Sequence, residues 1–151
     1  MSIKKDELNE YFNNTRFIVL ATVNGEQEPI QRSLGSFAAQ DLTVYFSTHK
    51  ATAKVEQIKQ NSNVSILFQH EGQELPSFRN AVVVGTAKQI TVREELDKAI
   101  ELLGNRSPRF RDRALKGELS DNAFYRVEPS QIKVVDFAKG AGANSVEVIS
   151  F

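Results

Sequence analysis

Residues 42–68, LTVYFSTHKATAKVEQIKQNSNVSILF, hold two strand patterns on either side of a helix pattern. In residues 42–47, Leu42, Val44 and Phe46 alternate with Thr43, Tyr45 and Ser47. This is the two-residue period of a strand with one face in a core. Apolar side chains then recur at i, i+4 and i+7, and this spacing predicts a helix over residues 48–61. Residues 63–69 are again apolar and β-branched, as is typical of a strand.

The flanking sequence predicts more strands and few helices. Residues 4–14 have the spacing of a short amphipathic helix. Residues 16–23 and 29–37 are strand-like and are joined at Asn24-Gly25, a pair typical of hairpin turns. Downstream we expect strands at 80–90, 123–127, 131–137 and 145–151, a helix at 93–103 ending at Gly104, and a loop or short helix at 105–122. Six to eight antiparallel strands favour a closed or nearly closed β-barrel, since closure protects strand edges.

The composition is that of one globular domain spanning residues 1–151. Hydrophobic residues make up 40% of the chain and charged residues 25%, which excludes a disordered or fibrous protein. No Pro-, Gly- or Ser-rich linker and no repeat divides the chain. We therefore expect a single core.

Charge and hydropathy exclude several classes of partner. Nineteen basic side chains balance nineteen acidic ones, so the molecule as a whole has no attraction to nucleic acid or to an anionic membrane surface. The longest apolar runs, at 17–21 and 81–84, are far shorter than the roughly 20 residues that span a bilayer. The polar N-terminus is unlike a signal peptide, and the absence of cysteine suits a reducing compartment. These features predict a cytoplasmic protein with no membrane or nucleic-acid partner.

The start of the predicted helix has the features of an anion site. Lys50 and Lys54 fall in its first two turns, after a suitable N-cap at Ser47 or Thr48, where the helix dipole is already positive. Like charges at i, i+4 cost roughly 0.2–0.5 kcal/mol, and a phosphate would offset that cost. Arg32 adds a guanidinium on an otherwise apolar strand face. A solvated charged surface fits the same spacing, so the pattern alone leaves both interpretations open.

Residues 42–68 and Arg32 together resemble the pyridoxamine 5′-phosphate oxidase-like family of FMN-binding split β-barrels. The strand, the F-S-T turn, the Lys-bearing helix and the following strand match the family pattern, and Arg32 stands at the expected distance before the turn. The similarity runs from about residue 16 to 90 and continues more weakly to 137. The resemblance implies a mainly β split barrel that binds FMN as a homodimer, with the flavin at the subunit interface.

Position by position, the resemblance also implies which residues contact FMN. Arg32 and Lys54 would be the main cations for the phosphate, with Thr52 as a hydroxyl donor. Ser47 and Thr48 would lie against the ribityl chain and the phosphate. The remaining implied contacts are Ser33 and Leu34 beside the isoalloxazine ring, Asn80 near the flavin, and Lys50, for which a solvated side chain is an equal alternative.

Two departures from the family bear on the reaction. Relatives that oxidise pyridoxamine phosphate have a lysine at the position of Phe37, and they carry a C-terminal segment with tryptophan and arginine that binds substrate. This chain has no tryptophan, and its ending, KGAGANSVEVISF, has no arginine. We therefore expect an FMN-dependent oxidoreductase that acts on an unknown small substrate and is not a true pyridoxamine 5′-phosphate oxidase.

The catalytic residues stay unassigned, and this leaves alternatives. His49 and His70 are isolated, and lone histidines more often make structural hydrogen bonds than act as bases. With two distant histidines and no cysteine, no metal site is expected. A non-catalytic flavin-binding or flavin-sequestering protein is the first alternative, and a related barrel that uses the deazaflavin F420 or haem is the second. Haem is disfavoured because haem-degrading relatives place their histidine near the C-terminus.

A cluster of arginines in NRSPRFRDR has two interpretations. It would supply a cation to a phosphate or anionic substrate across the dimer, or it would form a solvated loop. Its members are Arg106, Arg109, Arg111 and Arg113.

Overall fold

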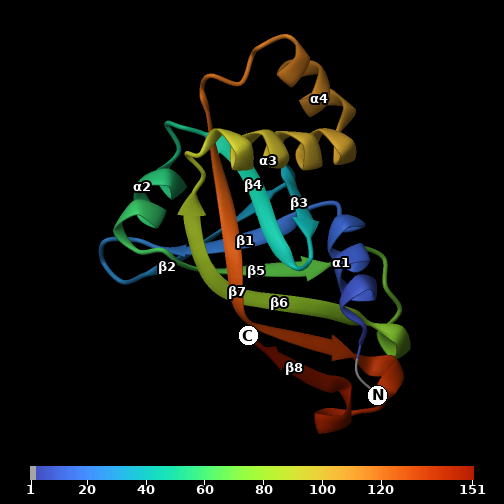
Figure 1. The fold of residues 1–151 in the computed structure, drawn as a ribbon. Helices are drawn as coiled ribbons and strands as arrows, with labels where there is room; N and C mark the ends of the chain where they lie inside the picture. Colours follow the sequence, from blue (N-terminus) through green and yellow to red (C-terminus); the bar gives the residue numbers. More distant parts are fainter. Residues whose placement is uncertain (1–2) are drawn as a thin grey trace.

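The computed structural model describes residues 3–151 as one curled antiparallel sheet flanked by helices (Figure 1). Seven strands follow the order β2-β1-β5-β6-β7-β4-β3, and β8 pairs with β7 off this path. The strands are β1 Ile18–Val23, β2 Pro29–Leu34, β3 Phe37–Gln40, β4 Thr43–His49, β5 Asn63–Gln69, β6 Arg79–Gln89, β7 Asn122–Asp136 and β8 Val146–Ser150. The helices are α1 Lys5–Asn13, α2 Ala53–Gln60, α3 Arg93–Arg106 and α4 Pro108–Leu115, with short 3₁₀ turns at Leu75–Ser77, Phe137–Lys139 and Gly142–Ser145. The predicted mainly β barrel of six to eight strands is confirmed.

The ends of several elements differ from the prediction. The strand expected over 29–37 divides into β2 and β3, which are separated by Gly35 and Ser36 and pair with different neighbours, β1 and β4. The two strands expected at 123–127 and 131–137 form the single strand β7, which continues through Pro129. Opposite this proline, the register between β6 and β7 shifts between Val84 and Gly85.

The helical region after β6 also differs. Gly104 was expected to end a helix, but α3 continues through it to Arg106. Gly104 lies against α4, where a Cβ at this position would be 3.4 Å from the Cβ of Arg111. Within the expected loop or short helix, α4 begins at Pro108 with Ser107 as its N-cap, whose Oγ accepts a hydrogen bond from the Phe110 N–H. These two helices lie over one end of the sheet (Figure 1).

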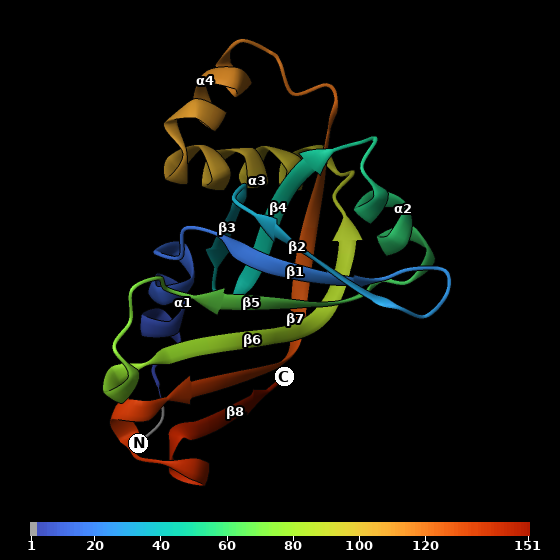
Figure 2. The same cartoon turned by 180° about the vertical axis from the view of Figure 1, so that it is seen from behind.

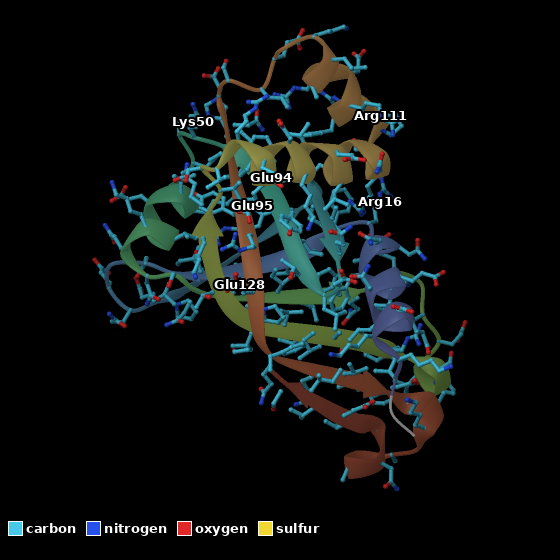
Figure 3. The ribbon with its side chains drawn as sticks, in the orientation of Figure 1. Arg16, Lys50, Glu94, Glu95, Arg111 and Glu128 are labelled. Atoms are coloured by element: carbon cyan, nitrogen blue, oxygen red, sulfur yellow. The ribbon has the colours of Figure 1, made fainter. Side chains whose placement is uncertain are left out.

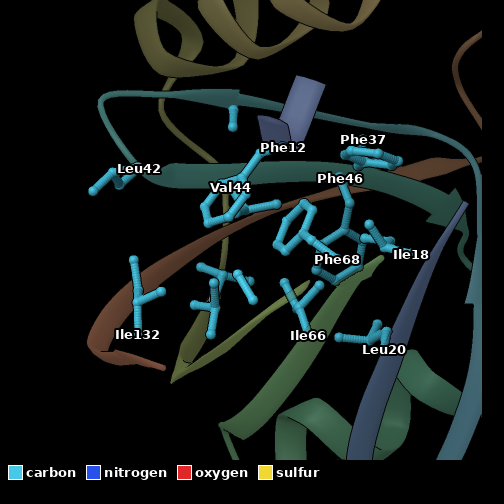
Figure 4. Packing of buried hydrophobic residues seen from close by; sticks show 14 of the residues in the cluster. Phe12, Ile18, Leu20, Phe37, Leu42, Val44, Phe46, Ile66, Phe68 and Ile132 are labelled. Atoms are coloured by element: carbon cyan, nitrogen blue, oxygen red, sulfur yellow. The ribbon is translucent and has the colours of Figure 1, made fainter. Parts of the chain in front are cut away.

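The core has two parts because both faces of β4 are buried. Val44 and Phe46 point into the barrel, where they meet side chains of α1, β1 and β5 such as Phe12, Leu20 and Phe68 (Figure 4). Tyr45 points the other way, into a second cluster formed with α3, α4 and β7. The alternation in residues 42–47 predicted one buried face, and α3 buries the other.

Arg106, at the C-terminal end of α3, donates hydrogen bonds to backbone carbonyls in the N-terminal part of the chain. Its Nε donates to the carbonyl of Asn13 at 3.0 Å, and its Nη1 donates to those of Gly35 and Phe37 at 3.2 and 3.0 Å. Its Nη2 donates to the carbonyl of Thr15. The guanidinium also lies 3.8 Å from the centroid of the Phe37 ring, so a lysine at position 37 would bring two cations together.

Replacing Arg106 with lysine will destabilise the protein although the charge is kept. A lysine ammonium lacks the planar fork that reaches several carbonyls at once, so partly buried acceptors lose their donor. We expect a loss of about 2 kcal/mol, which lowers the melting temperature by about 4–8 °C. Arg111→Lys is the matched control, since Arg111 is exposed and, within residues 3–151, its side chain donates to Asn105 Oδ1 alone. Equal melting temperatures for the two variants would contradict this role of Arg106.

Candidate functional site

Arg32 lies on the edge strand β2 with one side of its guanidinium held by the protein. Its Nη1 donates to Thr22 Oγ1 at 2.7 Å and contacts the Ile30 and Leu20 carbonyls at 3.1 and 3.3 Å. Its Nη2 donates to Gln57 Oε1 at 2.8 Å, and Thr22 Oγ1 donates to the same oxygen at 2.6 Å. Its Nε makes no hydrogen bond within residues 3–151. The guanidinium is therefore fixed in place with donors to spare.

Lys54 lies in the first turn of α2, close to Arg32. Partial burial lowers the pKa of Lys54, and the charge of Arg32 lowers it further. Burial alone lowers the pKa of Arg32. In the part of the chain that the structure describes, neither cation makes a salt bridge. Two partly buried positive charges thus repel each other with no carboxylate paired to either within residues 3–151, an arrangement that an anion would stabilise.

The turn between β4 and α2 supplies hydroxyl groups to the same region. Ser47 and Thr48 are buried at the end of β4. The Thr48 and Thr52 hydroxyl oxygens are 3.4 Å apart, and the Thr52 hydroxyl also donates to the His49 carbonyl at 3.0 Å. The Ser47 hydroxyl accepts a hydrogen bond from Asn122 Nδ2 at 2.7 Å.

The helix predicted to begin at Thr48 begins later, at Ala53, after the N-cap residue Thr52. Thr48 and His49 are still paired with β7, opposite Ala123 and Asn122, and this pairing delays the helix. Lys50 therefore lies in the turn, where its backbone N–H donates to the Asp121 carbonyl. The predicted i, i+4 repulsion between Lys50 and Lys54 on one helix is therefore wrong, and the cation whose charge lowers the pKa of Lys54 is Arg32.

The structure does not gather all of the expected residues. Ser33 is exposed and Leu34 packs against the core at the end of β2, next to the Arg32 position. Asn80 lies on β6, three strands along the sheet from β2, and donates to Gln69 Oε1 at 3.1 Å. Within one chain, Asn80 is therefore separate from the cluster around Arg32.

Thr22 and Gln57 hold Arg32, and the sequence analysis did not single them out. Gln57 follows Lys54 by three residues and so shares its helix face, which was a usable signal. The contact of Thr22 with Arg32 could be predicted only from the strand register. In that register Leu20 of β1 pairs with Arg32, and Thr22 lies two residues further along the same face. Figure 2 shows α2 near the hairpin end of β1 and β2, where these residues meet.

The two histidines have structural partners. His70 stacks on Tyr11 with ring centroids 3.7 Å apart, and its Nε2 lies 2.9 Å from the Tyr11 carbonyl. His49 Nδ1 accepts a hydrogen bond from the Ala51 N–H at 3.1 Å. Residues 3–151 contain no group of three or more side chains suited to holding a metal. None of the helices in this range is long and apolar enough to cross a membrane.

Comparisons with known proteins support the same fold and family. A family model described as pyridoxamine 5′-phosphate oxidase matches residues 5–136. A conserved hypothetical protein from Mycobacterium tuberculosis has a TM-score of 0.77 at 15% identity, with 95% of each chain covered. General Stress Protein 26 from Bacillus anthracis has a TM-score of 0.67 at 20% identity, covering 97% of this chain and 98% of the other.

A further similar structure is a heme binding protein from Mycobacterium smegmatis, with a TM-score of 0.76 at 12% identity. It matches 99% of this chain, which corresponds to 59% of that protein. No curated protein matches this chain. At these identities the solved structures establish the barrel fold.

Proposed function

This chain belongs to the pyridoxamine 5′-phosphate oxidase family, and on that premise we propose that it binds FMN and acts as an FMN-dependent oxidoreductase on a small substrate. The observation that carries the proposal is the pair Arg32 and Lys54, two partly buried cations with no carboxylate partner among the described residues 3–151. The expected form is a homodimer with the flavin at the interface, as the family resemblance implies, and the Arg32 cluster lies on β2, at one end of the strand order.

The residues present fit a phosphate group. Arg32 has an Nε that makes no hydrogen bond within residues 3–151, and Lys54 supplies an ammonium group. The Thr48 hydroxyl at the end of β4 and the Thr52 hydroxyl before α2 lie close to each other. Charge-assisted hydrogen bonds from such donors are the strongest that a protein makes to phosphate. Thr22 and Gln57 hold the guanidinium in advance, which reduces the entropy lost on binding.

Bound FMN would supply hydride or electron transfer, and the protein would supply position and electrostatics. Ser33 and Leu34 follow Arg32 on β2, so a phosphate anchored at Arg32 directs the rest of the ligand along this strand. The haem alternative is less favoured, because binding through His70 would break its stack and hydrogen bond with Tyr11.

The test compares two ligands that differ only in the phosphate. We expect the purified protein to carry FMN, identified by its visible spectrum and by mass spectrometry. After removal of the ligand, FMN will bind about two to four decades more tightly than riboflavin, since two charge-assisted contacts are each worth roughly 1.5–3 kcal/mol. Equal affinities, or a haem spectrum in the purified protein, would contradict the proposal.

A second measurement separates an enzyme from a flavin-binding protein. Anaerobic NADH or NADPH should bleach the bound flavin of an oxidoreductase that uses either donor. Light scattering on the same sample tests the dimer.

A further inference from the structure

A cavity of about 420 Å³ lies between α3 and the connection from α4 to β7. The end of β6, the start of β7 and the turn after β4 complete its lining. Arg32, Thr48, Thr52 and Lys54 do not belong to this lining, so the cavity is separate from the candidate flavin site. Its volume is suited to a small molecule.

The inner wall of the cavity is apolar. Ile90 and Phe124 are buried members of the second core cluster and form its floor. Leu96 and Ile100 of α3 and Leu119 of the connection line it and are only partly buried. A ligand with an apolar body would remove this surface from water, which is worth about 25 cal/mol per Å².

The end of α4 brings the connection back over α3. Gly117 has a φ of 69°, and its N–H donates to the Ala114 carbonyl at 3.1 Å. The Glu118 N–H donates to the Arg113 carbonyl at 2.9 Å, and these two hydrogen bonds form the Schellman motif that ends a helix. The chain reverses here, and Leu119 becomes part of the cavity wall.

The cations that line the cavity are Lys50 and Arg93, and both are exposed at its solvent side. No carboxylate side chain belongs to the lining. Lys50 makes no salt bridge within residues 3–151. Arg93 pairs with Asp97 at 3.1 Å, but both side chains are largely exposed, and such surface pairs contribute little. The nearest acids of the connection, Glu118 and Asp121, are exposed outside the lining.

The arginines of the NRSPRFRDR segment do not line this cavity. Arg106 is occupied by backbone carbonyls, as described above. Arg109 and Arg111 are exposed on α4. Arg113 donates to Asn122 Oδ1 at 3.0 Å and so holds the amide of a residue that does line the cavity.

Two residues of the lining connect the cavity to the turn that precedes α2. Asn122 donates to the hydroxyl of the buried Ser47 at 2.7 Å. The Lys50 N–H donates to the Asp121 carbonyl at 2.8 Å, which joins this turn to the chain entering β7. Figure 3 shows Lys50 at this turn. Lys50 is therefore a residue of the cavity, and the same turn carries the Thr52 hydroxyl toward Lys54.

We propose that this cavity binds a small carboxylic acid with an apolar body and that the bound acid strengthens FMN binding. The carboxylate contacts Lys50 and Arg93, and the apolar body lies on Leu96, Ile100 and Leu119. A bound ligand that orders Lys50 orders the turn before α2, which reduces the entropy lost when FMN binds. The regulatory effect rests on the proposed function, whereas the acid site stands on this chain's own residues.

The first test uses 3-phenylpropionate as the probe and the FMN-free protein with ¹³C-labelled isoleucine and leucine methyl groups. We expect the methyl signals of Ile100 and Leu119 to shift and to saturate at millimolar concentration. The uncharged 3-phenylpropionamide and the small anion acetate should each bind about tenfold more weakly or worse. Absence of saturable shifts at these methyl groups, or equal affinity for either comparison compound, would overturn the acid site.

Two double variants test the assigned cations. Lys50→Met/Arg93→Met should weaken 3-phenylpropionate binding about tenfold or more. The matched control, Lys98→Met/Lys116→Met, removes two exposed cations of α3 and the α4 end that lie outside the lining, and it should bind the probe as the wild type does. Equal weakening by the control would show a general effect of surface charge and would overturn the assignment.

The regulatory effect is measured by titrating FMN with and without saturating 3-phenylpropionate. We expect the probe to raise the FMN affinity about fivefold, and FMN to raise the probe affinity by the same factor. Lys50→Met/Arg93→Met should lose this response. An unchanged or lowered FMN affinity would overturn the regulatory role. Failure of FMN to bind without the probe refutes the proposed function, and the methyl shifts are measured without FMN.

Discussion

Replacing both Arg32 and Lys54 with methionine will lower the affinity for FMN by about two to four decades and leave the affinity for riboflavin nearly unchanged. Each lost charge-assisted contact to the phosphate costs roughly 1.5–3 kcal/mol, and riboflavin makes no such contact. The measurement is a flavin fluorescence titration with both ligands. Lys59→Met, an exposed position on the same helix, is the matched control and should bind FMN as the wild type does.

A loss of riboflavin affinity equal to the loss of FMN affinity would show that the variant damages the fold or the ring site, and it would count against the phosphate assignment. Unchanged FMN affinity would refute the assignment outright. The single variants Arg32→Met and Lys54→Met separate the two contributions. Since Thr22 and Gln57 position Arg32, its loss should be the larger.

The lowered pKa of Lys54 adds a pH signature to the same experiment. The charged form of Lys54 binds phosphate, so FMN affinity should fall as pH rises through its pKa, which lies below the usual value of 10.5. The free energy of unfolding depends on pH in the opposite direction. The unfolded chain binds the proton more tightly, so the stability of the FMN-free protein contains a penalty that disappears as pH rises through this window. Both effects should be absent from Lys54→Met.

Replacing Gly85 with alanine will destabilise the barrel by about 3 kcal/mol and lower the melting temperature by about 6–12 °C. A Cβ at this position would lie 2.2 Å from the Glu128 carbonyl oxygen and 3.1 Å from the Pro129 Cα. All of the nearest atoms belong to the backbone of β7, so no side chain can move aside. The paired strands must separate where their register shifts.

Gly25→Ala is the matched control for Gly85→Ala, measured by thermal unfolding. A Cβ on Gly25 would meet only the end of the flexible Gln60 side chain, at 3.3 Å, and that side chain is exposed. Its melting temperature should change by less than about 2 °C. A Gly85→Ala protein as stable as Gly25→Ala would mean that β6 and β7 tolerate the change by shifting, and the close approach would not be required.

The ion pairs of Arg126 attach α3 to the sheet. Arg126 on β7 pairs with Glu95 of α3 and, through its Nε at 2.8 Å, with Glu128 on its own strand. Figure 3 shows Glu95 on α3 and Glu128 on the strand below it. These pairs raise the pKa of Arg126 against the opposing effect of burial. Arg126 thus attaches the N-terminal half of α3 to β7, and Arg106 attaches its C-terminal end to the N-terminal part of the chain.

The sequence by itself determined the strand and helix periods, the barrel class and the family. Residues 63–69 form β5 as their composition predicted, and the charge of Arg32 acts on Lys54 by lowering its pKa. These features follow from local spacing, because the period of apolar side chains is set by backbone geometry within a few residues. The family resemblance linked Arg32 to the turn before α2 without any knowledge of the register.

Only the tertiary structure decided where α2 begins, how Arg32 is held and what the four arginines do. Pairing with β7 keeps Thr48 and His49 in a strand, and Thr22 reaches Arg32 through strand register. Arg106 donates to carbonyls of residues far away in the chain, whereas Arg113 donates to Glu118 and Asn122, which follow it closely. Hydrogen bonds between distant segments depend on register and packing, and the local pattern of a sequence contains neither.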